Sequence, residues 1–404
     1  MKRNPVNLSR REFFRTSLLA GAAGVVGFQG PSILAGRRND NLDDGGDPVH
    51  SEVFRGDGYF AAWPANHGIW SWDDEILVGF QVARHQERSG HSWDPATSRH
   101  KFGRSLDGGV TWSVEDAFES GITAEATGHR LGDLAVEPGE CPGGIEFTHP
   151  DFALTFRRRR NVAGPSCFFY SYDRGKSWKG PYAFPDLGTR GVATRTEYLV
   201  QGKHELLAFL TTAKDDGQIG WSACARTGDG GKSWTKLSWI ETEPEGQAIM
   251  PAAVRLSSSK ILAVVRRTGD RSRPGARKWL SSYLSEDNGS SWRLLGEPAD
   301  KLGWNSHPPA LLKLRDGRLN LTYAVRGSPS RVVTRFSSDE GRNWGDEIVL
   351  RDGDGANRDM GYPRVVQRTD GKVVVVYYYN HALDDAKPPY RYIAATLFDP
   401  EEIV

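Results

Sequence analysis

The sequence predicts an all-β protein, a six-bladed β-propeller with about four antiparallel strands in each blade. Three observations lead to this fold class. An eight-residue turn pattern occurs five times, a strand–turn–strand pattern alternates with it, and the chain is rich in Gly (46 residues) and Trp (13 residues). Repetition at this scale is typical of supersecondary units that stack around an axis or along a line.

The eight-residue pattern is Ser/Thr-x-Asp-x-Gly-x-Ser/Thr/Asn-Trp. Its Asp can accept hydrogen bonds from the backbone of its own turn, and the Gly two positions later supplies a positive φ at no steric cost. The closing Trp offers a large apolar face for packing. We therefore interpret the five aspartates as structural rather than catalytic or metal-binding. They are Asp107, Asp173, Asp229, Asp287 and Asp339.

The second pattern is a Pro that opens an apolar strand, a tight turn and another apolar strand. It begins at Pro64, Pro251, Pro308 and Pro363. Asp-Gly between apolar runs, as at residues 316–317 and 370–371, is a strong hairpin signal. The two remaining units are expected at residues 142–156, opening with an inner strand over 142–147, and at residues 197–210.

The sixth unit ends in the strand RYIAATLF, residues 391–398, without the Asp pattern. Propellers often close by pairing the first and last segments in one blade, and we expect residues 51–55 to supply the outer strand there. A seventh blade would need a unit within residues 113–139, which carry no strand–turn–strand pattern.

The N-terminus carries paired arginines, Arg10 and Arg11, ahead of a Gly/Ala-rich apolar stretch over residues 17–28. This arrangement resembles a twin-arginine export signal, and the stretch is short for a membrane span. We expect a signal over residues 1–35, a flexible leader over 36–49 and the propeller over 50–404. The protein would then be periplasmic or extracellular, with no stable membrane span in its mature form. The alternative is a basic disordered tail.

Composition excludes several classes of partner. The 52 basic and 51 acidic residues are interspersed and leave a net charge of +1, so nothing indicates nucleic acid or an anionic membrane. The four consecutive arginines at 157–160 are interpreted as a solvated strand end and loop. Three cysteines imply no disulfide framework, and no Cys/His cluster has zinc spacing. We expect a monomer with no metal and no cofactor.

The axial pocket of a propeller is lined by residues that open each innermost strand and residues that end its hairpin partner. Polar groups at these equivalent positions of different blades would converge on one spot. The first set is Trp63, Cys141, Met250, His307 and Tyr362, and the second is Arg84, Arg157, Arg266, Arg326 and Asn380.

The five Asp turns resemble the Asp-box, or BNR, repeats of the sialidase (neuraminidase) superfamily, over about residues 50–404. The resemblance implies a glycosidase in which a Tyr activated by a Glu is the nucleophile, an Asp is the acid/base and three arginines hold the sugar's carboxylate. A phenol, with a usual pKa of about 10, needs a base or cationic neighbours to attack.

Carried over residue by residue, the resemblance implies that Tyr362, in DMGYP, is the nucleophile and that Asp94, in the first-blade loop, is the acid/base. Arg266 matches the arginine after the fourth blade's second strand, and its planar fork suits a carboxylate. Further expected substrate contacts are Arg84, an auxiliary arginine, Arg331, a looser match, and Arg326, Trp63, His307 and Gln247.

Two positions depart from the family pattern. Where the family has Arg-Ile-Pro, this chain has Ala62 followed by Trp63 and Pro64, and the activating Glu is replaced by Met250. Glu245, just upstream, is the candidate carboxylate that remains. Losing one arm of the arginine clamp removes a charge-assisted hydrogen bond worth roughly 1.5–3 kcal/mol, which leaves the identity of the sugar open.

The leading hypothesis is an exported glycoside hydrolase that removes terminal, acidic or neutral, sugars from external glycans. The alternative is a non-catalytic carbohydrate-binding propeller with an aromatic platform around Trp63, Trp70 and Trp304, or a polysaccharide lyase on the same blades. An enzyme requires Tyr362, Arg266 and an acid close together.

Overall fold

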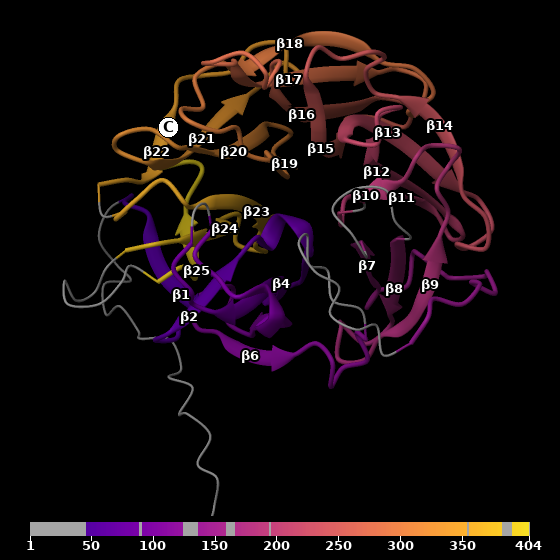
Figure 1. Cartoon of the computed structure of the whole chain (residues 1–404), viewed down its shortest axis with the longest axis horizontal. Coiled ribbons are helices and arrows are strands. Elements are labelled where there is room, and N and C mark those ends of the chain that lie inside the picture. The colour runs from indigo at the N-terminus through magenta and orange to yellow at the C-terminus, as the bar shows by residue number, and fades with distance from the viewer. Residues whose placement is uncertain are drawn as a thin grey trace, which may run out of the picture. The chain divides into compact units, whose positions relative to one another are not determined.

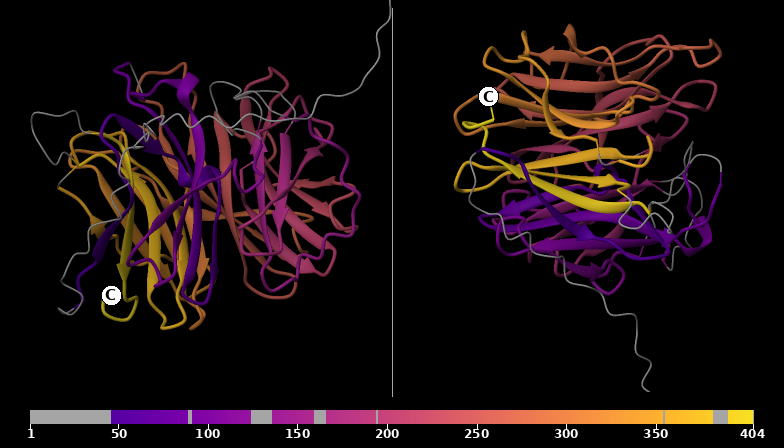
Figure 2. Two further views of the ribbon diagram at one scale, coloured as in Figure 1. Left: turned by 90° about the horizontal axis from the view of Figure 1, so that it is seen from below. Right: turned by 90° about the vertical axis from the view of Figure 1, so that its left-hand side faces the viewer.

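Six antiparallel sheets are arranged as blades around a central axis in the computed structural model (Figure 1). The structure describes residues 46–88, 91–123, 136–158, 166–193, 195–353, 355–381 and 390–403, which belong to one compact unit. The predicted export signal and most of the predicted leader lie outside the described residues. Seen from the side, the blades present their edges to the viewer and their loops gather at the two faces (Figure 2).

The first three blades follow one another along the chain. Blade 1 contains β2 (Tyr59–Ala62), β3 (Ile69–Trp72), β4 (Glu75–Arg84), β5 (Arg99–Ser105) and β6 (Ser113–Asp116), with the short 3-10 helices η1 (Pro64–Asn66) and η2 (Pro95–Thr97). Blade 2 contains β7 (Ala153–Arg158), β8 (Ser166–Ser171) and β9 (Lys179–Phe184). Blade 3 contains β10 (Val192–Ala193), β11 (Tyr198–Gly202), β12 (Glu205–Ala213), β13 (Ile219–Thr227) and β14 (Thr235–Trp239).

The last three blades each have four strands. Blade 4 contains β15 (Gln247–Arg255), β16 (Ile261–Thr268), β17 (Lys278–Ser285) and β18 (Arg293–Ala299). Blade 5 contains β19 (Ala310–Lys313), β20 (Leu319–Val325), β21 (Arg331–Ser337) and β22 (Ile348–Arg351). Blade 6 contains β23 (Gly361–Gln367), β24 (Val373–Tyr379) and β25 (Tyr392–Phe398), with β1 (Val49–Phe54) as its outermost strand.

The ring closes in blade 6, as the sequence predicts. Strand β1 pairs antiparallel with β25, from Val49 opposite Leu397 to Phe54 opposite Ile393. Strand β24, VVVVYYY, is buried along its whole length because the neighbouring blades cover both of its faces. Its β-branched and aromatic residues suit a strand without a solvent face. The six-bladed architecture is confirmed.

The Asp turns hold each blade against the one before it. In all five turns the Asp accepts hydrogen bonds from the backbone and side chain of the residue four positions later; for Asp229 these come from Ser233 N (3.0 Å) and Ser233 Oγ (2.5 Å). A Cβ added at Gly341 would lie 2.7 Å from Leu262 of the preceding blade, and the φ of Gly341 is 82°. Gly is therefore required both for the turn and for the contact between blades.

The inner strand predicted for blade 2 at residues 142–147 is wrong. Gly143 and Gly144 have φ values of 84° and 72°, which turn the chain out of the extended conformation. The segment instead binds the Asp turn of blade 3, where Gly144 N donates to Asp229 O at 2.9 Å. Cys141 is consequently buried against Gly230 in this interface and not at the axis, where the sequence placed it.

Candidate functional site

Three bulky residues that open the inner segments of blades 1, 4 and 6 share one unusual conformation. Trp63, Met250 and Tyr362 each precede a Pro and have φ values of 63°, 56° and 57°. The left-handed region is sterically costly for such side chains, and residues before Pro normally avoid helical conformations. Strain of this kind persists where the surrounding structure enforces it, and it concentrates at functional sites. The residues that open these blades are therefore candidates for the functional site.

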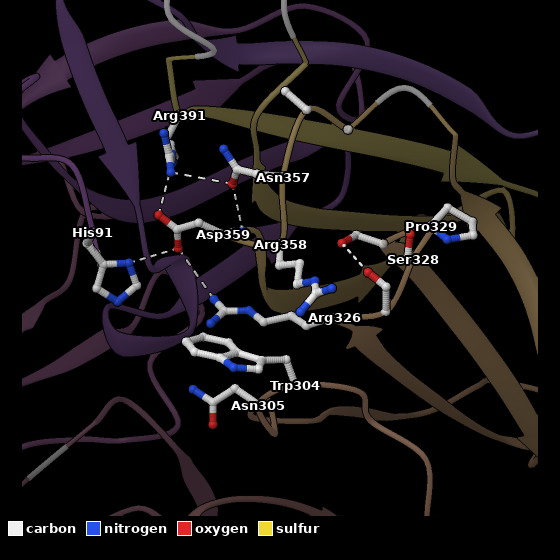
Figure 3. Close-up of a pocket in the computed structure, with 14 residues that line it drawn as sticks. His91, Trp304, Asn305, Arg326, Ser328, Pro329, Asn357, Arg358, Asp359 and Arg391 are labelled. Carbon is white, nitrogen blue, oxygen red and sulfur yellow. Dashed lines mark hydrogen bonds and ion pairs between the residues drawn. The ribbon is translucent and has the colours of Figure 1, made fainter. Parts of the chain in front are cut away.

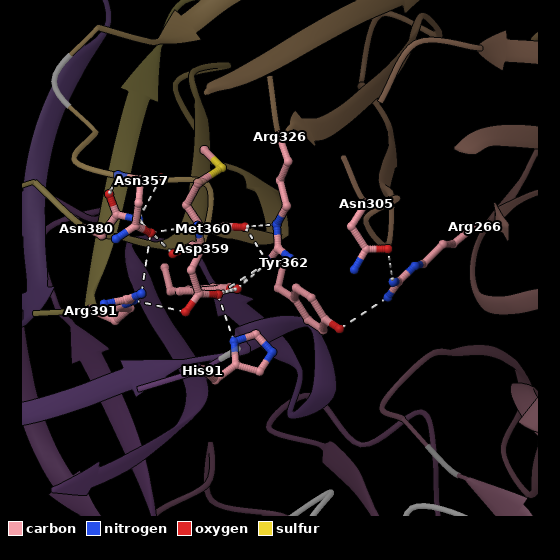
Figure 4. Close-up of polar contacts among 11 residues, drawn as sticks. His91, Arg266, Asn305, Arg326, Asn357, Asp359, Met360, Tyr362, Asn380 and Arg391 are labelled. Carbon is pink, nitrogen blue, oxygen red and sulfur yellow. Dashed lines mark hydrogen bonds and ion pairs between the residues drawn. The ribbon is translucent and has the colours of Figure 1, made fainter. Parts of the chain in front are cut away.

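Tyr362 meets Arg266 at the axis, as Figure 4 shows. The Tyr362 hydroxyl accepts a hydrogen bond from Arg266 Nη1 at 3.2 Å, and the Tyr362 ring lies edge-to-face against His307 at 5.7 Å between centroids. Arg266 is buried and also donates to Ser306 Oγ (3.0 Å) and Asn305 Oδ1 (3.4 Å). The structure thus brings together three residues that the sequence assigned to the pocket, Tyr362, Arg266 and His307.

Two further buried arginines, Arg158 and Arg195, lie within electrostatic range of Tyr362. Arg195 Nη1 donates to the Asn66 side chain, while Arg158 has no hydrogen-bond or ion-pair partner within the described ranges. Burial lowers the pKa of Arg158 to about 10, and burial together with the charge of Arg158 lowers the pKa of Arg195 well below its usual value. Among the described residues, no carboxylate pairs with these two cations, although a carboxylate normally neutralises buried charge.

The buried arginines change the pKa of Tyr362. Burial alone would raise the pKa of the Tyr362 phenol, but the charges of Arg266, Arg195 and Arg326 outweigh it and lower the pKa to about 8. Within the described part of the chain, no carboxylate contacts the Tyr362 hydroxyl. Among the described residues, the lowered pKa of the phenol is therefore due to cations.

The structure does not bring Glu245 to Tyr362. Glu245 is exposed, and its carbonyl accepts a hydrogen bond from Arg267 Nη2 at 3.4 Å beside a separate outer cavity of about 790 Å³. Gly246 explains the displacement: a Cβ there would lie 2.1 Å from Thr268 O, so the chain turns tightly at the end of β16 before β15 begins. Gln247 pairs with Thr268 at the same end of the blade.

Asp94 and Arg84 lie side by side in the first-blade loop. Asp94 caps the short helix η2, where its carboxylate accepts a hydrogen bond from Ala96 N at 3.0 Å. The Arg84 carbonyl accepts from Asp94 N at 2.8 Å, and the Arg84 side chain is exposed. The local turn uses the Asp94 carboxylate, so the acid/base role assigned to it stays a prediction.

The other predicted contacts divide into two groups. Arg326 is buried beside the site and donates to Tyr378 Oη at 2.5 Å. Arg331 instead forms an ion pair of 3.4 Å with Glu347 within blade 5. Trp63 is buried in an aromatic cluster against Phe60, and Trp70 is buried as well, so of the three tryptophans predicted to form a platform only Trp304 (64% exposed) offers its face to solvent.

A cavity of about 720 Å³ opens next to this group (Figure 3). Its wall is formed by the segments that precede β19, β23 and β25, the segment that follows β20, and the loop after β4. Asn305 lines the cavity and also contacts Arg266, which connects the cavity to the Tyr362 group. Other residues of its wall are His91, Trp304, Arg326, Asp359 and Arg391.

Asp359 is the carboxylate of this cavity. Its Oδ1 lies 2.8 Å from both His91 Nδ1 and Tyr378 Oη, and its Oδ2 accepts from Arg391 Nε at 2.9 Å. Burial alone would raise the pKa of Asp359, but the hydrogen bond and charge of His91 and the charges of Arg326 and Arg391 hold it well below its usual range. Asp359 is therefore ionised at neutral pH.

Sequence reasoning missed several of these residues. The interpretation of residues 157–160 as solvated is wrong for Arg157 and Arg158, which are buried because β7 is covered on both faces; residues 159 and 160 lie outside the described ranges. Four arginines directly after the apolar run FALTF were a signal that could have been read as a buried cluster. Arg195, His91 and Asp359 carry no local signal, because their partners are distant in the sequence.

The fold and the axial tyrosine–arginine site define a sialidase-like six-bladed β-propeller. The chain belongs to the BNR repeat-like domain family, whose model matches residues 149–375. No match was found among curated proteins.

Solved structures show the same fold. A protein of unknown function from Dyadobacter fermentans is 20% identical, with a TM-score of 0.64 over 88% of this chain and 98% of its own. The GH93 α-L-arabinofuranosidase of Fusarium graminearum, in complex with arabinobiose, is 13% identical, with a TM-score of 0.56 over 86% and 99%. The Trypanosoma rangeli sialidase, in complex with sialic acid, is 14% identical, with a TM-score of 0.53 over 89% of this chain and 58% of its own. At these identities the likeness concerns the fold.

Neither a membrane helix nor a metal cluster is found in the part of the chain that the structure describes. No helix there is long and apolar enough to cross a membrane, and no three His, Cys, Asp or Glu side chains are grouped to hold a metal ion.

Proposed function

We propose that this protein is a glycoside hydrolase that removes terminal acidic sugars from glycans, with Tyr362 as its nucleophile. One observation carries the proposal: the Tyr362 hydroxyl lies 3.2 Å from Arg266, among buried arginines for which the described residues supply no carboxylate partner. A glycan that carries a carboxylate would supply the missing negative charge and place its anomeric carbon near the phenol.

The arginines explain how a phenol can attack without a neighbouring base. With a pKa of about 8, roughly a tenth of Tyr362 is phenolate at pH 7. The cations that lower the pKa take over the task of the glutamate that Met250 replaces. A phenolate attacks the anomeric carbon, the glycosidic bond breaks, and water later releases the sugar from the tyrosine.

The same arginines support an acidic substrate. A planar guanidinium binds a carboxylate through two parallel hydrogen bonds, and Arg266 is already fixed by Ser306 and Asn305. In this proposal, Arg158 and Arg195 complete the clamp that lacks an arginine at Ala62. Binding a carboxylate would also relieve the repulsion among the three cations.

A second candidate, a lyase acting on uronate-containing polysaccharides, is favoured by His307. Its imidazole is fully buried against Tyr362, and neither ring nitrogen has a hydrogen-bond partner within the described ranges. In a lyase, the Tyr362 phenolate would take the proton from the carbon next to the carboxylate. The bond to the leaving oxygen would break, a carbon–carbon double bond would form in the sugar ring, and the leaving oxygen would take up the proton from Tyr362, which returns to phenolate.

One assay distinguishes these activities. The purified protein is incubated with 4-methylumbelliferyl glycosides of N-acetylneuraminic acid and glucuronic acid, and separately with polyuronates. Released methylumbelliferone supports the hydrolase, and an unsaturated product that absorbs in the ultraviolet supports the lyase. Tyr362→Phe should abolish turnover. The control variant Tyr170→Phe, in β8 of blade 2, should leave turnover unchanged. Absence of turnover on every substrate, with glycan binding retained in Tyr362→Phe, would identify a carbohydrate-binding propeller.

The proposal that the substrates are external glycans rests on the twin-arginine-like N-terminus. Cell fractionation of the full chain and of an Arg10→Lys/Arg11→Lys variant tests it. Export should fail in the variant, and a cytoplasmic location of the unmodified protein would contradict it.

A further inference from the structure

We propose that His91, held by Asp359, is the proton-transfer group of this site, and that Asp94 is not. The inference rests on the proposed hydrolase function and assigns its acid/base. His91 and Asp94 come from the same first-blade loop, but only His91 lines the 720 Å³ cavity that Asn305 connects to Arg266.

The orientation of His91 follows from its partner. Asp359 is ionised, so its Oδ1 can only accept, and the His91 Nδ1 at 2.8 Å must carry the hydrogen. The Nε2 atom is then the nitrogen that exchanges a proton with solvent or substrate. In Figures 3 and 4 the second ring nitrogen of His91 points away from Asp359. A carboxylate that orients an imidazole and stabilises its charged form is a general device of acid–base catalysis.

Asp359 is a positioning residue and is itself fixed. Tyr378 Oη (2.8 Å) and Arg391 Nε (2.9 Å) donate to it, and Arg326 lies 3.5 Å away. The His91 ring is held edge-on by Trp63, at 5.1 Å between centroids. These contacts leave the imidazole little freedom to turn away from its carboxylate.

Other charged and titratable groups surround the pair. Arg391 of blade 6 and Arg326 of blade 5 face Asp359, and Arg88, in the loop of His91, donates to Trp93 O at 3.3 Å. His307 of blade 5 is neutral, because burial and the charge of Arg326 lower its pKa well below the usual value. Asp359 is thus the anion that His91 contacts.

The His91–Asp359 pair and Tyr362 share two neighbouring residues. Tyr378 touches both: its hydroxyl donates to Asp359, and its ring lies 6.0 Å from the Tyr362 ring. Trp63 contacts His91 and lies in the same apolar cluster as Tyr362. A sugar between Tyr362 and the cavity would therefore have its leaving oxygen within the region that His91 lines.

The two steps balance with these groups alone. In the first, the Tyr362 oxygen bonds to the anomeric carbon, the glycosidic bond breaks, and the proton on Nε2 of the His91 imidazolium passes to the leaving oxygen. In the second, neutral His91 takes a proton from water, the water oxygen bonds to the anomeric carbon, and the Tyr362 phenolate leaves. His91 ends protonated, as it began.

The test uses leaving groups of different acidity. His91→Gln should lower turnover of an alkyl glycoside, such as a lactose-linked acidic sugar, by about 100-fold or more. The 4-methylumbelliferyl glycoside of the same sugar should lose far less in the bond-breaking step, because its leaving group needs no proton. Azide should restore the second step and yield the glycosyl azide. His85→Gln, in the same loop, is the matched control.

Equal losses of turnover on both glycosides in His91→Gln would overturn the assignment of His91 as the proton-transfer group. It would also be overturned if Asp94→Asn, instead of His91→Gln, lost turnover mainly on the alkyl glycoside. Circular dichroism checks that each variant is folded. A second measurement needs no substrate: nitrogen NMR of histidine-labelled protein, with the His91 signal identified by its absence in His91→Gln. A hydrogen on Nδ1 of neutral His91 that is no longer on that atom in Asp359→Asn supports the His91–Asp359 pair. A hydrogen on Nε2 of neutral His91 in the unmodified protein contradicts it. If no glycoside is cleaved, the proposed function fails while this measurement still decides the geometry.

Discussion

Glu197 and Arg364 form an ion pair across the propeller axis, with Nη1 and Oε2 separated by 2.5 Å. Glu197 lies between β10 and β11 of blade 3, Arg364 lies in β23 of blade 6, and these blades stand opposite each other in a ring of six. Arg364 also donates to Ala65 O of blade 1 (2.6 Å), while Glu197 accepts from Ala253 N of blade 4 (3.0 Å). Two side chains thus connect four blades, two residues along the strand from Tyr362.

Removing one partner of this pair should destabilise the whole ring. Arg364→Met leaves Glu197 as a buried, uncompensated charge (both side chains are 13% exposed), which typically costs about 3–5 kcal/mol of unfolding free energy. Urea denaturation at pH 7 measures the loss. The matched control is Arg277→Met, which breaks the exposed pair with Glu297 and should cost no more than about 1 kcal/mol. Similar losses in both variants would contradict a clamp at the axis.

Tyr362 should ionise well before most tyrosines of the protein. Its pKa is lowered to about 8, while burial raises the pKa of Tyr170 and of Tyr198 to about 12. A tyrosinate absorbance titration should show an early transition near pH 8 that disappears in Tyr362→Phe and moves upward in Arg266→Met. Turnover of the 4-methylumbelliferyl glycoside at low substrate should rise through the same pH, because phenolate is the attacking form and this leaving group needs no proton from His91. An unchanged first transition in Tyr362→Phe would refute the assignment.

The same shift makes stability depend on pH. The folded pKa of Tyr362 lies below its unfolded value of about 10, so ionisation favours the folded state. This contribution is fully present above pH 10 and is lost as the pH falls through 8. Wild type should therefore gain thermal stability relative to Tyr362→Phe between pH 8 and pH 10, and a constant difference over that range would contradict the shift.

Arg158→Met should stabilise the free protein and weaken the binding of acidic sugars. The substitution removes a buried cation that has no partner within the described ranges, and the depressed pKa of Arg158 corresponds to roughly 3 kcal/mol. Melting temperature is measured with and without N-acetylneuraminic acid and glucuronate, since a ligand raises it only if it binds the folded state. Arg293→Met, at the exposed start of β18, is the control. A less stable variant that still responds to the sugars would refute the role.

Asp229→Ala should reduce stability without changing the chemistry of the site. It removes the hydrogen bonds from Ser233 and Thr227, at a cost of about 1–2 kcal/mol. Burial alone would raise the pKa of Asp229, but these hydrogen bonds lower it below 3.8. Its contribution is therefore present above pH 3.8 and lost as the pH falls through the folded pKa. The melting-temperature difference from wild type should shrink at low pH, and a changed turnover rate at a permissive temperature would argue against a purely structural role.

Short-range patterns predicted most of the fold. The five Asp turns form their bonds within a few residues, so each is visible in the sequence, and β1 could be placed against β25 because one blade lacked its outer strand. The inner strand predicted for blade 2 at residues 142–147 is wrong because Gly143 and Gly144 turn the chain toward the Asp turn of the next blade. That contact joins residues that are far apart in the sequence, so no periodic sequence pattern indicates it.

The sequence by itself determined the propeller, its closure and the meeting of Tyr362 with Arg266, since strand ends at equivalent positions of a ring must converge. Only the tertiary structure decided which charges lower the pKa of the phenol and which groups surround it. Arg158, Arg195 and Asp359 come from three different blades, and their pKa values depend on burial and on charges that are distant in sequence. Electrostatic coupling is set by separation in space, and that separation exists only once the ring has closed.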